Sequence, residues 1–196
     1  MELFTNWHTW HDAEPELRRL LPAPDADAVA RAVEFAVRRH GDQTRPTGAP
    51  YAEHLLEALE VLVRGVGVTD PEILQAAVLH DVVEDTPCTL EEVRRTFGGR
   101  VAELVGWVTK PEPAEGADRT AAKEAYLRRL RDAPEDAVVV KLADRVSNVQ
   151  TLRNLGLPKQ RQYYAETVRF IMPLAARREW WADWYSAWQR AHQDLA

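Results

Sequence analysis

The chain of 196 residues is long enough for one well-buried core, so we expect one compact domain with an extension at each end. Its 25 lysines and arginines face 31 aspartates and glutamates, and this net charge of −6 argues against a general nucleic-acid binder while permitting a local basic pocket. One cysteine excludes an intrachain disulfide, no secretory signal is apparent, and no apolar run approaches the roughly 20 residues of a membrane span, so we expect a soluble, cytoplasmic protein.

Nearly every segment has helical rather than alternating hydrophobic periodicity, so the sequence predicts an all-α fold. Residues 27–40 place valines four apart, which is the pattern of an amphipathic helix. Residues 50–64 repeat this pattern with leucines. The segment 41–50 between them is rich in glycine and proline and is predicted to be a loop.

The segment "TDPEILQAAVLHDVVED" predicts a central helix that begins with Asp70 as its N-cap. Residues 73–79 are apolar almost all round, which is typical of a buried helix. The following Thr-Pro predicts a helix end and leaves Asp81, Glu84 and Asp85 in the last turn. Because the helix dipole disfavours carboxylates there, this stretch predicts a bound cation.

Further helices are predicted downstream at 89–98, 101–108, 120–131, 135–155 and 166–192. The helix at 120–131 is polar and should be exposed, whereas the helix at 135–155 is strongly apolar. The last segment is expected to form one helix bent at Pro173 or two helices. Two prolines and a glycine predict a flexible loop at 110–119.

We predict three parts in the chain: an N-terminal extension at 1–26, a helical domain at 27–178 and a Trp-rich C-terminal helix at 179–196. Trp180, Trp184 and Trp188 are four apart and should cover one helix face. Packing against the domain is the simpler interpretation. A homo-oligomer contact is the alternative, because tryptophan is enriched at interfaces.

Four side chains on the predicted helices are candidate metal ligands. His80 and Asp81 come from the buried helix, Asp144 from another apolar helix, and His54 lies near the start of the helix at 50–64. Imidazole and carboxylate ligands with open coordination positions suit hydrolysis of phosphate esters. A divalent cation would offset the cost of burying these groups and would make nearby carboxylates favourable.

Glu84 and Asp85 lie one helical turn beyond the His80–Asp81 pair. At that distance they are too far away to bind the ion directly. They are candidates to orient or deprotonate an attacking water.

Several blocks of the sequence resemble a known family in their order and content. They are "RRHGDQTRPTGAPYAEH" at 38–54, "LQAAVLHDVVEDT" at 74–86, "FGGRVAELVGWVTK" at 97–110, "VKLADRVSNVQTL" at 140–152 and "ETVRFIMPLA" at 166–175. The chain is similar to the HD-domain hydrolases, and within them to the RelA/SpoT-type guanosine tetraphosphate hydrolases and their small stand-alone members. An HD dipeptide alone is weak evidence, but "HDVVEDT" together with "KLADRxxNxxTL" is specific.

The resemblance implies a single HD-domain helical bundle with helical extensions and a defined chemistry. It implies one Mn²⁺ ion held by the residues that match the family ligands, His54, His80, Asp81 and Asp144, and an attacking water handled by Glu84 and Asp85. The implied substrate is a purine nucleotide with a 3′-pyrophosphate, of the guanosine tetra- or pentaphosphate type. The implied product is pyrophosphate.

The same resemblance suggests where the nucleotide binds. Arg45 matches a family arginine at the nucleotide pocket, and Asn148 and Thr151 match residues that contact the nucleoside. Tyr51 and Tyr164 are weaker candidates for the pocket.

Three positions depart from the family pattern. Pro46 stands where relatives commonly have a lysine that packs over the purine, so guanine preference is weakened. Ser147 stands where many have histidine, and Leu55 replaces a proline. The sequence therefore leaves three alternatives open: hydrolysis of another purine nucleotide (an adenine alarmone or the 2′-phosphate of NADPH), a non-catalytic alarmone-binding module, or a structural protein whose aromatic tail recruits a partner.

Overall fold

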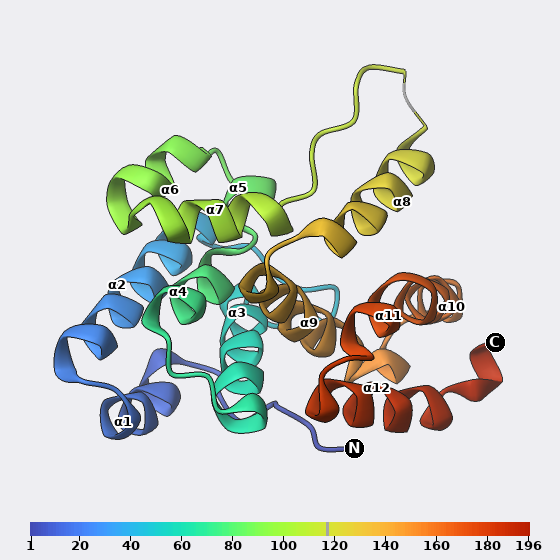
Figure 1. Ribbon diagram of the computed structural model, residues 1–196, viewed down its shortest axis with the longest axis horizontal. Helices are drawn as coiled ribbons and strands as arrows, with labels where there is room; N and C mark the ends of the chain where they lie inside the picture. The colour runs from blue at the N-terminus through green and yellow to red at the C-terminus, as the bar shows by residue number, and fades with distance from the viewer. Residues whose placement is uncertain (117) are drawn as a thin grey trace.

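The computed structural model describes residues 1–116 and 118–196, and it is built from helices (Figure 1). The α-helices are α1 (Trp10–Leu20), α2 (Ala23–His40), α3 (Tyr51–Glu60), α4 (Pro71–Leu79), α5 (Val82–Asp85), α6 (Leu90–Phe97), α7 (Gly99–Val108), α8 (Arg119–Arg129), α9 (Glu135–Val149), α10 (Leu157–Glu166), α11 (Met172–Ala175) and α12 (Glu179–Ala191). Within the described ranges no strand forms, and Thr44 and Pro50 make an isolated β-bridge. The predicted all-α fold is confirmed.

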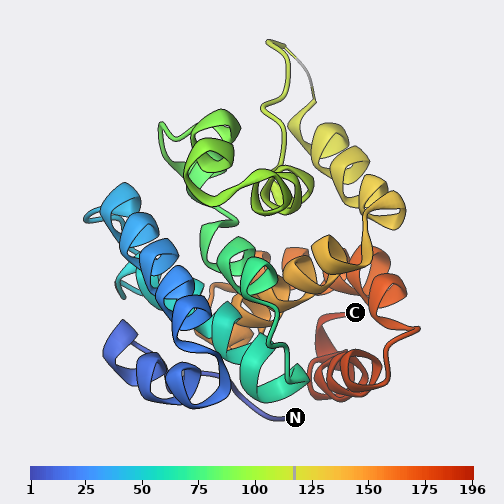
Figure 2. The same ribbon diagram turned by 60° about the vertical axis from the view of Figure 1, so that its left-hand side comes forward.

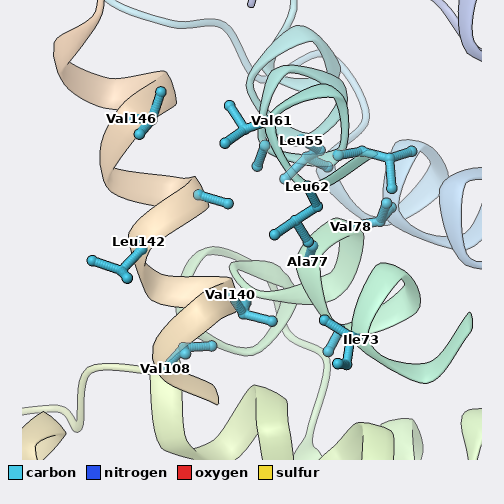
Figure 3. Close-up of a cluster of buried hydrophobic side chains, with 14 of the residues drawn as sticks. Leu55, Val61, Leu62, Ile73, Ala77, Val78, Val108, Val140, Leu142 and Val146 are labelled. Carbon is cyan, nitrogen blue, oxygen red and sulfur yellow. The ribbon is translucent and has the colours of Figure 1, made fainter. Parts of the chain in front are cut away.

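Helix α4 lies at the centre of the bundle, in contact with α2, α3, α7 and α9 (Figures 1 and 2). Its residues from Ile73 to Leu79 are all buried, as their apolar character predicts. Figure 3 shows the cluster in which Leu62, Ala77 and Val140 meet from segments far apart in the sequence. The same central packing brings α3 and α9 together.

The start of α4 is fixed as its sequence predicts. The carboxylate of Asp70 accepts hydrogen bonds from the amides of Glu72 at 2.9 Å and Ile73 at 3.3 Å, and Pro71 is the first helical residue. The predicted continuous helix through residue 85 is wrong, however. Helix α4 ends at Leu79, and α5 begins after a break.

Several other helix limits differ from the predicted ones. Helix α9 ends at Val149, and the C-terminal segment begins earlier than expected with α10. A π-helical segment, Thr167–Ile171, joins α10 to α11, and the chain breaks again before α12. Pro173 is the second residue of α11, which continues directly from the π-helical segment, and the predicted bend at this residue stays a prediction.

The C-terminal tryptophans are buried within the chain. Trp184 and Trp188 of the predicted face, together with Trp181, are each at most 5% exposed, whereas Trp180 is partly buried against the same core; the tail packs against the domain, as the simpler interpretation predicts. The indole of Trp188 donates to the carbonyl of Val149 at 3.0 Å, and the hydroxyl of Tyr185 donates to that of Leu142 at 2.8 Å. Because these rings are covered by their own chain, the tail offers little aromatic surface to a second copy, and the homo-oligomer stays a prediction.

The N-terminal segment belongs to the same core. The side-chain amide of Gln150 pairs with the backbone of Phe4, accepting from its amide at 2.7 Å and donating to its carbonyl at 2.9 Å. A Cβ at Gly65 would lie 2.5 Å from the ring of Trp180, so only glycine permits this contact. One cluster of buried apolar residues extends from Phe4 to Leu195, and the predicted domain boundaries stay predictions.

No helix among the described residues combines the length and the hydropathy that crossing a bilayer requires.

Candidate metal centre

The four predicted ligand residues converge on one point. Their donor atoms come from α3 (His54), the break between α4 and α5 (His80 and Asp81) and α9 (Asp144). The Nε2 atoms of His54 and His80 lie 3.1 Å apart. Asp81 Oδ2 lies 3.4 and 2.9 Å from them, and Asp144 Oδ1 lies 3.4 and 3.5 Å from them.

These spacings fit one divalent cation. Ligand atoms bound about 2.1 Å from an ion at octahedral or tetrahedral angles are about 3.0–3.4 Å from one another. Ligand atoms of His54, His80 and Asp81 lie within 4.8 Å of one another, as a shared ion requires. The donor set of two imidazoles and two carboxylates also suits a first-row transition metal.

The site is buried, and its charges depend on one another. His54, His80 and Asp144 are at most 5% exposed. Burial alone would raise the pKa of Asp81, but His80 and the hydrogen bonds from both imidazoles hold that pKa well below its usual range. Burial opposes ionisation of Asp144 in the same way, and Lys141 with the imidazoles holds its pKa well below the usual range. Against burial, Asp81 and Asp144 raise the pKa of His80.

The outer nitrogen of each imidazole has its own partner. His80 Nδ1 lies 2.7 Å from the carbonyl of Ala77, which can only accept, so Nδ1 carries the hydrogen. That carbonyl belongs to the last turn of α4, where it has no helical partner. His54 Nδ1 lies 2.7 Å from the hydroxyl of Ser147. Both rings therefore direct Nε2 at the centre, as metal-binding histidines do.

The break between α4 and α5 sets the place of the outer carboxylates. The hydroxyl of Tyr51 lies within hydrogen-bond distance of Asp81 Oδ2 and, at 2.9 Å, of Asp85 Oδ2, so the two carboxylates share its single hydrogen. Burial, and then the charge of Asp81, raise the pKa of Asp85. Glu84 pairs with the ammonium of Lys110 and accepts from its backbone amide at 2.9 Å. The donor atoms that lie within 4.8 Å of one another belong to His54, His80 and Asp81; Asp144 adjoins them through both imidazoles, and Glu84 and Asp85 are not part of that group.

A pocket of about 190 Å³ opens beside the centre and is lined by charges of both signs. Its carboxylates are Asp81, Glu84, Asp85 and Asp144, and its cations are Lys110, Lys123, Lys141 and Arg145. The cations come from three places in the chain: the end of α7, α8 and α9. Lys141 Nζ lies 2.7 Å from Asp144 Oδ2, and Lys123 Nζ lies 2.6 Å from Glu166 Oε1.

Arg145 differs from the three lysines because its guanidinium is incompletely paired. It is 5% exposed, and its Nε and Nη1 atoms have no hydrogen-bond partner among the described residues. Its nearest carboxylate oxygen, Glu166 Oε2, is 3.5 Å away, and the guanidinium lies over the ring of Tyr163 at 5.2 Å. A buried donor without a partner is uncommon and calls for an explanation.

Two of the five predicted substrate-binding residues line this pocket, namely Tyr51 and Asn148. Asn148 Nδ2 donates to the carbonyl of Asp144 at 3.1 Å and to its carboxylate, so the two side chains share one face of α9.

The other three predicted substrate-binding residues are not among the described residues that line this pocket. Arg45 pairs instead with the carboxylate of Glu57 at 2.9 Å. Thr151 lies just after α9, and the ring of Tyr164 is buried against Trp188 with the centroids 5.6 Å apart. Their roles in substrate binding stay predictions, and Tyr164 has no contact in the site that supports it.

Sequence reasoning missed the four cations of the pocket. Lys141 and Arg145 lie in the same motif as Asp144, so their spacing on the helix could have been noticed. Lys123 could not have been identified in this way, because α8 was predicted to be exposed. That prediction is wrong in part, since Tyr126 and Leu127 of α8 are buried and Lys123 reaches the pocket.

Comparison with known proteins places this geometry in a family. The model of the HD domain family matches residues 32–181. The chain is 38% identical over 174 residues to a guanosine-3′,5′-bis(diphosphate) 3′-pyrophosphohydrolase of Aquifex aeolicus, covering 86% of this chain and 24% of that protein. It is 35% identical over 164 residues to the bifunctional (p)ppGpp synthase/hydrolase SpoT of Escherichia coli, covering 82% of this chain and 23% of SpoT.

One solved structure is similar over most of its length. It is described as a metazoan ortholog of SpoT that hydrolyzes ppGpp; the TM-score is 0.67 at 27% identity, covering 75% of this chain and 84% of that one. The chain spans about a quarter of the length of the two curated relatives. The predicted resemblance is confirmed. A divalent metal is implied by this family and the ligand geometry agrees with it: the chain belongs to the HD-domain family.

Proposed function

We propose that this protein hydrolyses the 3′-pyrophosphate of guanosine tetra- and pentaphosphate alarmones, with Mn²⁺ as the divalent cation and pyrophosphate as the product. The observation that carries the proposal is the convergence of two imidazoles and two carboxylates beside a pocket with four cations. The names of the similar proteins support this choice of substrate. A reducing cytoplasm is the proposed location, in keeping with the free thiol of Cys88.

The four ligands would hold the cation between α3, α4 and α9. When bound, it supplies Lewis-acid polarisation of a phosphoryl oxygen and lowers the pKa of water. Asp85 lies beside the ligand Asp81, linked to it by Tyr51. Its raised pKa makes it a stronger base than an ordinary carboxylate, suited to take the proton of the attacking water. The water oxygen bonds to the phosphorus next to the ribose as its proton passes to Asp85, and the ribose 3′-oxygen leaves with the electrons of the broken bond and takes up a proton to become the 3′-hydroxyl.

The charges of the pocket favour a phosphorylated ligand. The four lining carboxylates and the four lining cations balance, so a divalent cation leaves the pocket with a net positive charge. Each lysine is paired with a carboxylate, whereas the Nε and Nη1 atoms of Arg145 are buried and have no hydrogen-bond partner among the described residues. Arg145 is therefore the best-placed donor for a phosphate oxygen.

A second candidate substrate follows from Pro46, which is exposed in the loop before α3. Without the family lysine, nothing at this position favours guanine, so an adenine alarmone or the 2′-phosphate of NADPH is the alternative. A non-catalytic alarmone-binding module is less well supported, because Glu84 and Asp85 both line the pocket.

The proposal is tested by stripping the purified protein of metal and restoring Mn²⁺, Mg²⁺ or Zn²⁺. The guanine alarmone, the adenine alarmone and NADPH are then offered separately, and released pyrophosphate and phosphate are measured. We expect pyrophosphate from the guanine alarmone with Mn²⁺. Phosphate from NADPH would support the alternative, and tight nucleotide binding without turnover would identify a binding module.

A further inference from the structure

A buried carboxylate lies directly behind the metal-facing histidine of α3. Glu57 follows His54 by three residues, is 7% exposed and is not one of the residues whose donor atoms meet at the centre. Its Oε2 atom is 2.9 Å from Arg45 Nη1 and also accepts from the hydroxyl of Ser147. A buried carboxylate is costly unless it is paired, so these two partners account for its presence in the core.

The directions of the hydrogen bonds follow from the chemistry of the groups. A carboxylate paired with a guanidinium only accepts, so the single hydrogen of the Ser147 hydroxyl points to Glu57. Ser147 Oγ is then left as an acceptor for His54 Nδ1–H, at 2.7 Å. The alternative partner of this hydroxyl, the carbonyl of His54, is farther away at 3.4 Å.

Arg45 holds the far end of this chain of contacts. Its Nη1 atom bonds to Glu57 of α3, and its Nη2 atom donates to the carbonyl of Ser147 in α9 at 3.3 Å. A turn fixes the arginine, with its amide donating to the carbonyl of Ala49 at 2.8 Å and its carbonyl accepting from Gly48 at 2.8 Å. The guanidinium therefore joins the two helices that carry His54 and Asp144.

We propose that Arg45, Glu57 and Ser147 form a positioning relay that fixes His54 with Nδ1 protonated and Nε2 directed at the metal, and thereby sets the affinity of the centre for its cation. The inference rests on the metal site of the proposed function. It assigns Arg45 a role behind a ligand, while the nucleotide contact expected from the sequence stays a prediction. Partners of this kind typically change metal affinity 10- to 100-fold.

The relay is tested on the full chain with Ser147→Ala, Glu57→Gln and the double variant. We measure the dissociation constant of Mn²⁺ by calorimetry on metal-stripped protein, and we check folding by circular dichroism. Ser147→Ala is expected to weaken Mn²⁺ binding about 10- to 100-fold. Glu57→Gln weakens it as well. Because the groups act in series, the double variant should bind no more weakly than Ser147→Ala alone.

Glu60→Gln provides the matched control. Glu60 is a fully buried carboxylate of the same helix, and it pairs with Arg64 and the N-terminal segment instead of a ligand. This change should lower thermal stability and leave Mn²⁺ affinity unchanged. Hydrolysis by the relay variants should recover at high Mn²⁺, which a purely structural defect would not allow.

The outcomes separate the two proposals. Unchanged Mn²⁺ affinity in Ser147→Ala, or independent effects that multiply in the double variant, would overturn the relay while the metal site stands. If the unaltered protein bound no Mn²⁺, or if His80→Ala bound it as tightly, the metal site itself would be wrong.

Discussion

The Nε2 atoms of His54 and His80 lie 3.1 Å apart, although the residues are separated by 26 positions in the chain. Two buried imidazoles this close need an ion or a shared proton between them, and Asp81 and Asp144 supply the balancing charge. The predictions below start from this contact.

His80→Ala should empty the metal site and destabilise the fold. It removes the imidazole that Asp81 and Asp144 share and leaves the carbonyl of Ala77 without its donor, so we expect a loss of about 3 kcal/mol in unfolding free energy. Metal content after dialysis and urea denaturation measure both effects. His192→Ala is the control, since His192 is a buried histidine whose ring contacts the carbonyl of Trp188, outside the metal centre. Retention of Mn²⁺ by His80→Ala would refute the ligand assignment.

Replacing Glu84 with Gln and Asp85 with Asn should reduce turnover by about 100-fold or more and spare metal content. Both substitutions keep the side-chain shape and remove the base. Single-turnover kinetics and metal analysis give the two readouts. Glu91→Gln, an exposed glutamate of α6, should change neither. Loss of metal from the double variant would argue that these carboxylates support the ion and do not handle water.

Arg145→Gln should raise KM more than it lowers kcat. A charge-assisted hydrogen bond contributes about 1.5–3 kcal/mol, so removal of a guanidinium bound to phosphate should raise KM about 10- to 100-fold. Arg169→Gln is the matched control, because Arg169 is exposed and pairs with Glu124 outside the pocket. An unchanged KM would show that Arg145 serves the packing around Tyr163 alone.

Stability should depend on pH differently with and without metal. In the metal-free protein the pKa of His80 is raised, so its contribution is complete below pH 6.5 and is lost as the pH rises through the raised pKa. Unfolding free energy should fall there by about 1.4 kcal/mol per pH unit for each proton released. Asp81, with its lowered pKa, adds stability above pH 3.8 that is lost on further acidification.

The Mn²⁺-saturated protein should not show the decline at high pH, because metal binding requires neutral imidazoles. Urea denaturation from pH 5 to 9, with chelator and with Mn²⁺, compares the two forms. If unfolding free energy changed with pH in the same way with chelator and with Mn²⁺, protons and metal would not compete for the same imidazoles.

Pro46→Lys should shift base preference toward guanine. A lysine stacked on a purine is worth about 0.5–1 kcal/mol, which corresponds to a two- to fivefold change in the ratio of kcat/KM for the guanine and adenine alarmones. Thr47→Lys adds the same charge at the neighbouring exposed position and should leave the ratio unchanged. If the ratio of kcat/KM for the two alarmones were the same in Pro46→Lys and Thr47→Lys, position 46 would not determine base preference.

Much of the metal centre could be predicted from the sequence because its ligands stand in motifs on apolar helices. His80, Asp81 and Asp144 are conspicuous as charges among buried residues. The break after α4 was not predictable from propensity, since His80 and Asp81 are compatible with a continuous helix. It depends on the imidazole of His80 bonding to the last turn of α4, a contact that only the folded centre specifies.

The positioning relay and the four cations of the pocket depend on contacts between distant segments. Arg45 and Glu57 are 12 residues apart, and Ser147 reaches them from 90 positions further on. From the sequence, Ser147 was only a departure from the family pattern, whereas in the structure it completes the contacts of His54. Hydrophobic periodicity reports which face of a helix is buried, but it does not identify which polar groups meet there.

The last helix donates two side-chain hydrogen bonds to α9, one from Tyr185 to Leu142 and one from Trp188 to Val149. These two carbonyls lie on either side of Asp144 along the backbone. Damage to the aromatic tail, although remote from any reacting atom, would therefore loosen the segment that presents one of the four ligands. Oxidation or truncation at the C-terminus would therefore lower the affinity of the centre for its metal ion.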